Sequence, residues 1–300
     1  MVKPRALITG ATGFIGRQLA ARLETDSWRV VRAVRSGPEG LPSGYLGLGP
    51  SPWDAGTFAA AIAVVRPDVI FHFAGVTRSN TAAAFYATNV TMCAHLLDAV
   101  AASNIHPRVV LAGSAAEYGF VPEEELPVRE DMICSPITHN GISKYAQTQL
   151  GLAFNRGGER VLVTRIFNPI GTGMPEHLAL GSFAAQIRSA KPILSVGNLS
   201  VERDFIDVAE AARLISALAS TPANFGRIFN ICSGVGYSLH DLVDKMVYLS
   251  GHPIRLQVST ERLRAGEMRC FRGSTANLEA AGLTITPSDL SLTLSRLITG

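Results

Sequence analysis

The stretch Ala6-Leu-Ile-Thr-Gly-Ala-Thr-Gly-Phe-Ile-Gly16 places three glycines at a G-x-x-G-x-x-G spacing directly after a short apolar run. The first, Gly10, permits a tight turn at a strand end, and the second, Gly13, lets the backbone approach a pyrophosphate. The third, Gly16, removes a side chain where a helix packs on a sheet. Because the next helix presents its N–H groups and positive dipole end to this turn, the stretch predicts a dinucleotide-binding turn.

Strand and helix patterns alternate along the first half of the chain. Short apolar runs predict buried strands at 5–9, 29–34, 69–73, 108–112 and 160–167, and amphipathic segments predict helices at 14–23, 54–65, 81–103 and 140–154. This alternation is typical of an α/β fold, a Rossmann-type doubly wound parallel sheet. Ligands of such sheets bind beyond the carboxyl ends of the strands, so we expect Gly10, Gly75 and Ser114 to meet in one crevice.

The pattern loosens after residue 170. Helices are expected at 179–190, 208–220, 239–249 and 289–298, and short strands at 227–231 and 254–258, whereas the Gly- and Pro-rich segment 41–52 is expected to be a loop. We therefore expect a Rossmann domain over 1–170 and a smaller C-terminal α/β substrate lobe over 171–300, with the chain free to cross between them.

Composition argues against several classes of function. Hydrophobic residues make up 47% of the chain and charged residues 17%, which predicts a large buried core. The net charge is +3 without a Lys/Arg run, so no nucleic-acid partner is expected. The four cysteines lie far apart, which indicates neither a metal site nor a disulfide framework. With no signal peptide or membrane-spanning stretch in the pattern, we expect a cytoplasmic protein without a membrane partner.

The end of the second strand bears on the choice of cofactor. Folds that bind NAD usually place a carboxylate there for the adenosine ribose, whereas this chain has Val34 followed by Arg35. A guanidinium pairs well with a 2′-phosphate, so NADP(H) is favoured over NAD(H), the alternative being that Arg35 is a solvated surface residue. Asp54 is expected either to cap the next helix or to reach the adenine, as the equivalent Asp does in families with this pattern.

Several motifs together resemble the extended short-chain dehydrogenase/reductase superfamily. They are Thr9-Gly-Ala-Thr-Gly-Phe-Ile-Gly16, Phe71-His-Phe-Ala-Gly75, Ser114-Ala-Ala-Glu-Tyr-Gly119 and Gly141-Ile-Ser-Lys144. In the second half, Arg165-Ile-Phe-Asn-Pro-Ile-Gly-Thr-Gly173, the stretch from Val196 to Asp207, Phe229-Asn-Ile-Cys-Ser-Gly234 and Arg262-Leu-Arg-Ala-Gly-Glu267 are similar to GDP-6-deoxy-4-keto-D-mannose reductases. Those enzymes reduce the 4-ketone of a nucleotide-sugar, so the resemblance implies a nucleotide-sugar substrate.

The resemblance implies a role for each matching residue. The cofactor would be bound by Gly10, Thr12, Gly13, Phe14, Ile15, Gly16, Arg35, Asp54, Ala74, Gly75, Lys144 and Asn168. The substrate would be bound by Ser114, Asn168, Arg203, Arg264 and Glu267. Ser114 would polarise the carbonyl, Lys144 would bind the nicotinamide ribose, and the two arginines would pair with the diphosphate. The alternative for Arg203 is a salt bridge to Asp204 or Asp207. Relatives often dimerise through the helices at 81–103 and 140–154, so a homodimer is expected.

One position departs from the family pattern. The superfamily has a catalytic Tyr-x-x-x-Lys pair, but Asn140 stands four residues before Lys144, and an amide gives up no proton at neutral pH. The candidate catalytic residues are therefore Ser114, Lys144, Asn140 and His139. The proton could come from His139, from a water held by Asn140 and Ser114, or from Lys144, and His139 could equally be an ordinary loop histidine.

Three functions are compatible with this site. The preferred one is NADPH-dependent reduction of a nucleoside-diphosphate 4-keto-6-deoxysugar with an atypical proton donor. The second is a nucleotide-sugar epimerase or dehydratase that recycles its cofactor within one turnover. The third is a catalytically inactive nucleotide-binding homologue.

Overall fold

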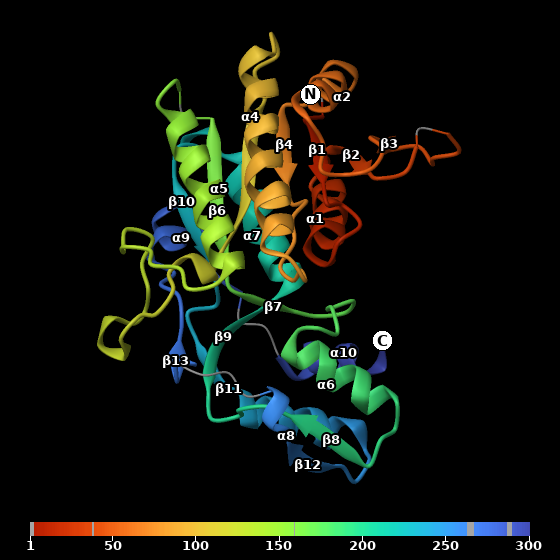
Figure 1. The fold of residues 1–300 in the computed structure, drawn as a ribbon, viewed down its shortest axis with the longest axis vertical. Helices are drawn as coiled ribbons and strands as arrows, with labels where there is room; N and C mark the ends of the chain where they lie inside the picture. Colours follow the sequence, from red (N-terminus) through yellow and green to blue (C-terminus); the bar gives the residue numbers. More distant parts are fainter. Residues whose placement is uncertain (1–2, 38, 159, 263–266, 287–289) are drawn as a thin grey trace.

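The computed structural model describes residues 3–37, 39–158, 160–262, 267–286 and 290–300. Within these residues, seven parallel strands form a central sheet in the spatial order β10-β6-β5-β4-β1-β2-β3 (Figure 1). They are β1 (Arg5–Thr9), β2 (Arg29–Val34), β3 (Tyr45–Gly47), β4 (Val69–His72), β5 (Arg108–Ser114), β6 (Val161–Ile166) and β10 (Ile228–Ile231). The expected Rossmann-type doubly wound parallel sheet is confirmed.

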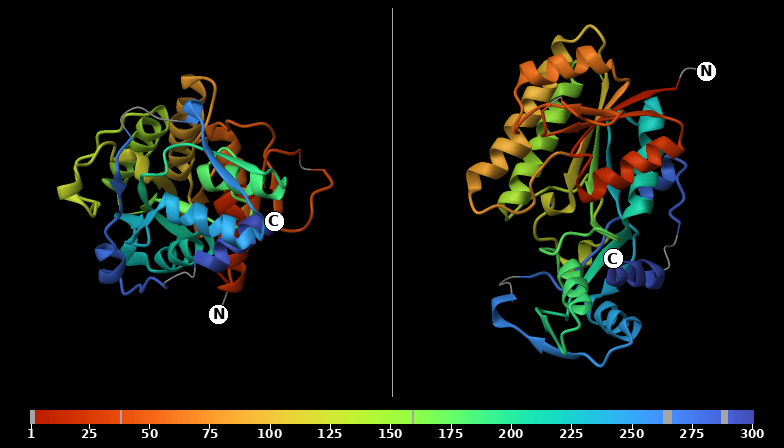
Figure 2. Two further views of the ribbon diagram at one scale, coloured as in Figure 1. Left: turned by 90° about the horizontal axis from the view of Figure 1, so that it is seen from below. Right: turned by 90° about the vertical axis from the view of Figure 1, so that its right-hand side faces the viewer.

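Helices cover both faces of this sheet (Figure 2, right). One face carries α1 (Phe14–Thr25) and α7 (Val208–Ser220), and the other carries α2 (Ala55–Val65), α4 (Met92–Ala102) and α5 (His139–Asn155). Consecutive residues of β1 enter opposite cores, because Ile8 packs on the α1–α7 side and Leu7 on the α2–α4 side. Since both faces are covered, the central strands are nearly continuous apolar runs.

A smaller lobe lies beyond the carboxyl edge of the sheet (Figure 1). Its strands β7 (Asn168–Ile170), β11 (Gly236–Ser238) and β13 (Cys270–Phe271) all pair with β9 (Glu202–Asp207), and β8 (Ile193–Val196) pairs with β12 (Arg255–Val258). Its helices are α6 (Ala179–Arg188), α8 (Leu239–Ser250) and α10 (Leu290–Thr299). They enclose a separate apolar core, and Phe14 at the start of α1 packs against it, which joins the two lobes.

The chain crosses back from the smaller lobe to the sheet. After β9, helix α7 packs beside α1, and β10 then pairs with β6 in register Phe229↔Thr164. The short helix α9 (Ala276–Ala280) also contacts β10. Residues 208–231 therefore complete the larger lobe although they lie within 171–300, and the division of the chain at residue 170 stays a prediction.

Two local features differ from expectation. The segment 41–52 contains β3, a short edge strand that pairs with β2. The helix expected over 81–103 consists of α3 (Ala82–Phe85), a π-helical turn (Tyr86–Thr91) and α4. In the described part of the chain, no helix is both long and apolar enough to cross a membrane.

Candidate active site

The glycine turn between β1 and α1 has no room for side chains at two of its three glycines. Gly10 has a φ of +69°, and a Cβ there would lie 2.5 Å from the backbone carbonyl of Phe73 on the neighbouring strand end. A Cβ on Gly16 would collide with the carbonyl oxygen of Gly10. Gly13 is the N-cap of α1 and offers no side-chain hydrogen bond to its first turn. The free N–H groups of that turn fit the pyrophosphate of a dinucleotide.

The side chains around this turn hold α1 in place. Phe14 packs on the core of the smaller lobe, and Ile15 packs on the core between α1 and α7. Thr12 and Gly13 are exposed. Any contact of Phe14 and Ile15 with a phosphate would therefore come from their backbone N–H groups.

The carboxyl ends of β1 and β4 are tied together by a buried network. The Thr9 hydroxyl bonds Nδ1 of His72 at 3.0 Å and accepts the backbone N–H of Ala74 at 3.2 Å. Burial lowers the pKa of His72 to about 3, so its imidazole is neutral. A Cβ on the following residue, Gly75, would lie 3.2 Å from Nζ of Lys144, so a glycine leaves room for that ammonium.

Lys144 lies on α5 and its side chain is buried at the sheet edge. Its Nζ donates to the carbonyl of Ala112 at 2.7 Å and to Oε1 of Gln147 at 3.0 Å. Burial lowers its pKa from 10.5 to about 8, and the nearby Glu117 carboxylate opposes this shift. The ammonium thus lies close to Gly75, in a buried position that destabilises its charged form relative to the neutral amine.

Ser114 ends β5, and a buried ion pair supports it. The Ser114 N–H donates to Oε1 of Glu117 at 2.8 Å, and Arg165 donates from Nε to Oε2 at 3.0 Å. Burial raises the pKa of Glu117, while Arg165 acts against that shift. The Ser114 Oγ accepts the N–H of Ala116 at 3.1 Å, which leaves its own hydrogen available for a substrate oxygen.

Asn140 and His139 begin α5 but face different neighbours. Asn140 stands one turn before Lys144 on the same side of the helix, and its Oδ1 is buried without a hydrogen-bond partner. His139 is exposed, and its Nδ1 lies 3.1 Å from the hydroxyl of Tyr86. The replacement of a catalytic tyrosine by Asn140 stays a prediction.

The expected substrate residues form a second cluster on β9. Asn168 donates to the carbonyl of Asp204 at 2.8 Å, which ties the end of the sheet to the strand that carries Arg203. Nη2 of Arg203 lies 3.5 Å from Oε1 of Glu267, so two of the expected residues meet. The two carboxylates considered as alternative salt-bridge partners of Arg203 have other contacts. Asp204 accepts four hydrogen bonds from residues 233, 234 and 273, and Asp207 caps α7. Arg264 lies outside the described residues.

Arg35 and Asp54 lie at the adenosine end expected for a dinucleotide. Arg35 follows β2 and is exposed, and within the described residues its side chain makes no ion pair or hydrogen bond. Asp54 caps α2, since its Oδ1 accepts both the N–H and the hydroxyl of Thr57 at 2.7 Å. The capping interpretation of Asp54 therefore has a structural basis, and contact with an adenine stays a prediction.

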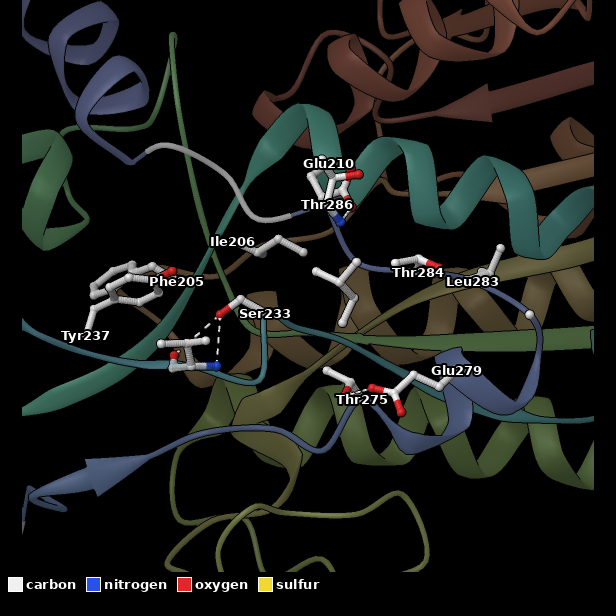
Figure 3. Close-up of a pocket in the computed structure, with 13 residues that line it drawn as sticks. Phe205, Ile206, Glu210, Ser233, Tyr237, Thr275, Glu279, Leu283, Thr284 and Thr286 are labelled. Atoms are coloured by element: carbon white, nitrogen blue, oxygen red, sulfur yellow. Dashed lines mark hydrogen bonds between the residues drawn. The ribbon is translucent and has the colours of Figure 1, made fainter.

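A cavity of about 480 Å³ opens between β9, α7 and α9 (Figure 3). Phe205 and Tyr237 lie at one end of it, and Leu283 lies at the other. None of the expected site residues in the described part of the chain lines this cavity. The candidate active site is instead the sheet edge formed by Gly10, Ser114 and Lys144.

Fold and site together define an NAD(P)-dependent oxidoreductase of the extended short-chain dehydrogenase/reductase type. Residues 6–232 match the model of the NAD dependent epimerase/dehydratase family, and the chain belongs to that family.

Individual relatives are similar over most of their length. A Pseudomonas aeruginosa protein named GDP-6-deoxy-D-mannose reductase is 30% identical, with 91% of this chain and 89% of that protein covered. A Kitasatospora kifunensis dTDP-6-deoxy-L-talose 4-dehydrogenase (NAD(P)(+)) is 29% identical, with 84% and 81% covered. The structure of RMD from Pseudomonas aeruginosa complexed with NADPH matches with a TM-score of 0.83 at 27% identity, covering 99% of this chain and 97% of that one.

Two residues of the site were not singled out from the sequence. Glu117 forms a capping box with Ser114, and the S-x-x-E spacing is a recognisable signal for that motif. Asn89 is fully buried, and its Nδ2 donates to Ser143 while its Oδ1 accepts the N–H of Val76. No local pattern marks Asn89, because its partners lie on two separate segments.

Proposed function

We propose that this chain catalyses the NADPH-dependent reduction of a nucleoside-diphosphate 4-keto-6-deoxysugar, with a proton donor other than a tyrosine at position 140. The observation that carries the proposal is the position of Ser114 and Lys144 at the carboxyl edge of the sheet, which Asn168 links to the strand of Arg203. The relatives named as a GDP-6-deoxy-D-mannose reductase and a dTDP-6-deoxy-L-talose 4-dehydrogenase support the substrate class.

Each lobe has a separate task in this proposal. When bound, the cofactor supplies a hydride to the sugar carbonyl. The N-terminus of α1 binds its pyrophosphate, and Lys144 binds its nicotinamide ribose. Ser114 donates a hydrogen bond to the carbonyl oxygen, which stabilises the charge that develops there. Arg203 binds the diphosphate of the substrate, for which it must give up its ion pair with Glu267. Glu267 then accepts hydrogen bonds from hydroxyl groups of the ligand.

The preference for NADPH rests on Arg35. Its guanidinium lacks a partner in the described residues, and β2 ends in Val34 rather than in a carboxylate that would repel a 2′-phosphate. The P. aeruginosa neighbour is described as complexed with NADPH, which agrees with this preference.

The test is a spectrophotometric assay of NADPH oxidation with GDP- and dTDP-linked 4-keto-6-deoxysugars. Oxidation matched by formation of the 4-hydroxysugar supports the reductase. Conversion of a nucleotide-sugar without net oxidation of the cofactor identifies an epimerase or dehydratase instead. Tight NADPH binding without turnover of any nucleotide-sugar identifies the inactive homologue.

A pair of variants tests the substrate lobe in the same assay. Arg203→Ala should raise KM for the ketosugar, because the diphosphate loses a charged hydrogen-bond donor. The matched control is Arg129→Ala, which removes an exposed arginine that pairs only with Asp131 in the described residues. Equal KM values for both variants would exclude Arg203 from the diphosphate site.

We also infer that the chain forms a cytoplasmic homodimer through the outer faces of α4 and α5. Ile142 on α5 is 38% exposed, and Leu152 on the same helix is half-buried. An Ile142→Asp variant should shift a dimer to monomer in light scattering, whereas Leu292→Asp on α10 should not. A monomeric parent chain would contradict this assembly.

A further inference from the structure

The proposed reduction, on which this inference rests, needs a proton for the carbonyl oxygen. Asn140 carries an amide, which releases no proton at neutral pH. The ammonium of Lys144 donates to Ala112 and Gln147. The phenol of Tyr118 is buried and donates to Oδ1 of Asn230 at 2.6 Å. These three groups, which lie on or beside the expected catalytic motifs, are therefore poor donors.

Tyr86 and His139 form a hydrogen-bonded pair directly beside the position of Asn140. The Oη atom of Tyr86 lies 3.1 Å from Nδ1 of His139, and the ring of Phe85 stacks on the imidazole with centroids 6.2 Å apart. Since α3 follows β4 and α5 follows β5, the N-terminal ends of both helices lie at the carboxyl edge of the sheet. Ligands of this fold bind at that edge.

The π-helical turn Tyr86–Thr91 anchors this pair to the site. Asn89, in the same turn, donates from Nδ2 to Ser143 at 2.9 Å and accepts the N–H of Val76 at 2.9 Å. Two contacts therefore join the two helices: Tyr86 to His139, and, one helical turn further along both, Asn89 to Ser143. Because Val76 follows Gly75, the turn couples the Tyr86–His139 pair to the loop beside Lys144. Such π turns occur frequently at functional sites.

We propose that His139 donates the proton to the carbonyl oxygen of the nucleotide-sugar, with Tyr86 as its positioning residue. Nδ1–H of His139 donates to the Tyr86 hydroxyl oxygen, which keeps that hydrogen on Nδ1 and leaves Nε2 as the nitrogen that gains and loses the catalytic proton. Within the described residues, Nε2 makes no hydrogen bond, and the aromatic rings of Phe85 and Tyr86 lie against the imidazole.

The proton and the hydride balance in this step. The carbonyl carbon accepts the hydride supplied by NADPH, and the Nε2–H bond of the protonated imidazole breaks as the O–H bond of the alcohol forms. The sugar ketone is reduced, NADPH is oxidised to NADP⁺, and His139 is left neutral with its hydrogen on Nδ1. His139 is exposed, so a proton from solvent can return to Nε2.

The experiment compares His139→Gln, Tyr86→Phe and the double variant His139→Gln/Asn140→Tyr with the parent chain. His139→Gln should lower kcat by about 10²–10⁴-fold, the usual contribution of a general acid, and leave the Kd for NADPH unchanged. Restoring a phenol at position 140 should recover most of that loss. His240→Gln, an exposed histidine on α8, is the matched control.

A second readout does not depend on turnover. The ¹⁵N chemical shifts of the neutral His139 ring in the cofactor-free protein should report the tautomer with hydrogen on Nδ1, and Tyr86→Phe should remove that preference. Unchanged tautomer populations in Tyr86→Phe would overturn the role of Tyr86. Equal kcat in the parent chain and His139→Gln would overturn proton donation alone, whereas a parent chain that reduces no ketosugar would refute the proposed reductase and the donor together.

Discussion

Replacing Lys144 by methionine should stabilise the cofactor-free protein while it abolishes turnover. The pKa of Lys144 is lowered from 10.5 to about 8, which corresponds to about 3 kcal/mol against the charged form in the folded state. Methionine fills a similar volume without the charge, but it leaves Oε1 of Gln147 without its donor, at about 1 kcal/mol. The carbonyl of Ala112 keeps its second hydrogen bond, from Nε2 of Gln147. The expected gain at pH 7 is about 2 kcal/mol.

The pH dependence separates this mechanism from a general packing effect. Between pH 8 and 10.5 the unfolded lysine binds more protons than the folded one, so the stability of the parent chain rises with pH across this window. The advantage of Lys144→Met should therefore be complete below pH 8, shrink by about 1.4 kcal/mol per pH unit above it, and reach zero before the pH reaches 10.5.

Urea unfolding at pH 7, 8, 9 and 10 measures this difference. Lys245→Met, an exposed lysine on α8, is the matched control and should change stability by less than about 0.5 kcal/mol at each pH. A Lys144→Met protein that is no more stable than the parent at pH 7 would refute the reasoning. An advantage that does not vary between pH 7 and 10 would refute it as well.

Three other substitutions test the rest of the site. Gly10→Ala should destabilise the fold by at least about 1–2 kcal/mol, because its φ is +69° and the Cβ would meet Phe73, and an unchanged urea midpoint would contradict this. Glu117→Gln should cost about 3–5 kcal/mol by leaving Arg165 buried without its carboxylate, and Glu117→Gln/Arg165→Met should regain much of that stability in the same measurement. Arg35→Gln should weaken NADPH binding by about 10–100-fold, as expected for a lost charged hydrogen bond, and leave NADH binding unchanged; equal effects on both cofactors would exclude a contact with the 2′-phosphate.

The elements of the larger lobe were predictable because their signals are local. The strand from Arg5 to Thr9 and the strand from Arg29 to Val34 have the expected bounds, since both are mostly apolar and lie in a sheet that is covered on both faces. Helix α7 also has its expected bounds, 208–220, because Asp207 caps it and one face is apolar. The alternation of such elements is sufficient to specify a doubly wound sheet.

Elements held by distant partners could not be read from local patterns. β3 is three residues long in a Gly- and Pro-rich segment, and it exists because β2 supplies its hydrogen bonds. β9 carries four charged residues among its six, so it has no apolar run, yet it pairs with three other strands. The π-helical turn has an ordinary helical sequence, and its extra residue per turn becomes apparent only in the folded chain.

The site shows the same division between local and distant information. The candidate site could be located from local motifs: the glycine turn and Ser114 each follow an expected strand, and Lys144 lies on an expected helix. These motifs together predicted a site at the carboxyl edge of the sheet. The ion pair between Arg203 and Glu267 joins residues 64 positions apart (267 minus 203). The sequence pattern around either residue therefore could not identify the other as its partner. The hydrogen bond between Tyr86 and His139 likewise depends on how two helices pack.

The energetics of the buried charges argue against an inactive homologue. Burial destabilises the charged form of Lys144 by about 3 kcal/mol, as its lowered pKa indicates. The Glu117–Arg165 ion pair behind Ser114 is also almost fully removed from water. Apolar side chains of similar volume are often at least as stabilising as a buried ion pair, so folding alone does not require these groups. Perturbed charges of this kind cluster at functional sites. If the chain only bound a nucleotide through its glycine turn, Lys144→Met should retain full NADPH affinity. A large loss of affinity, with the gain in stability, would mean that the charge at position 144 is maintained for the cofactor.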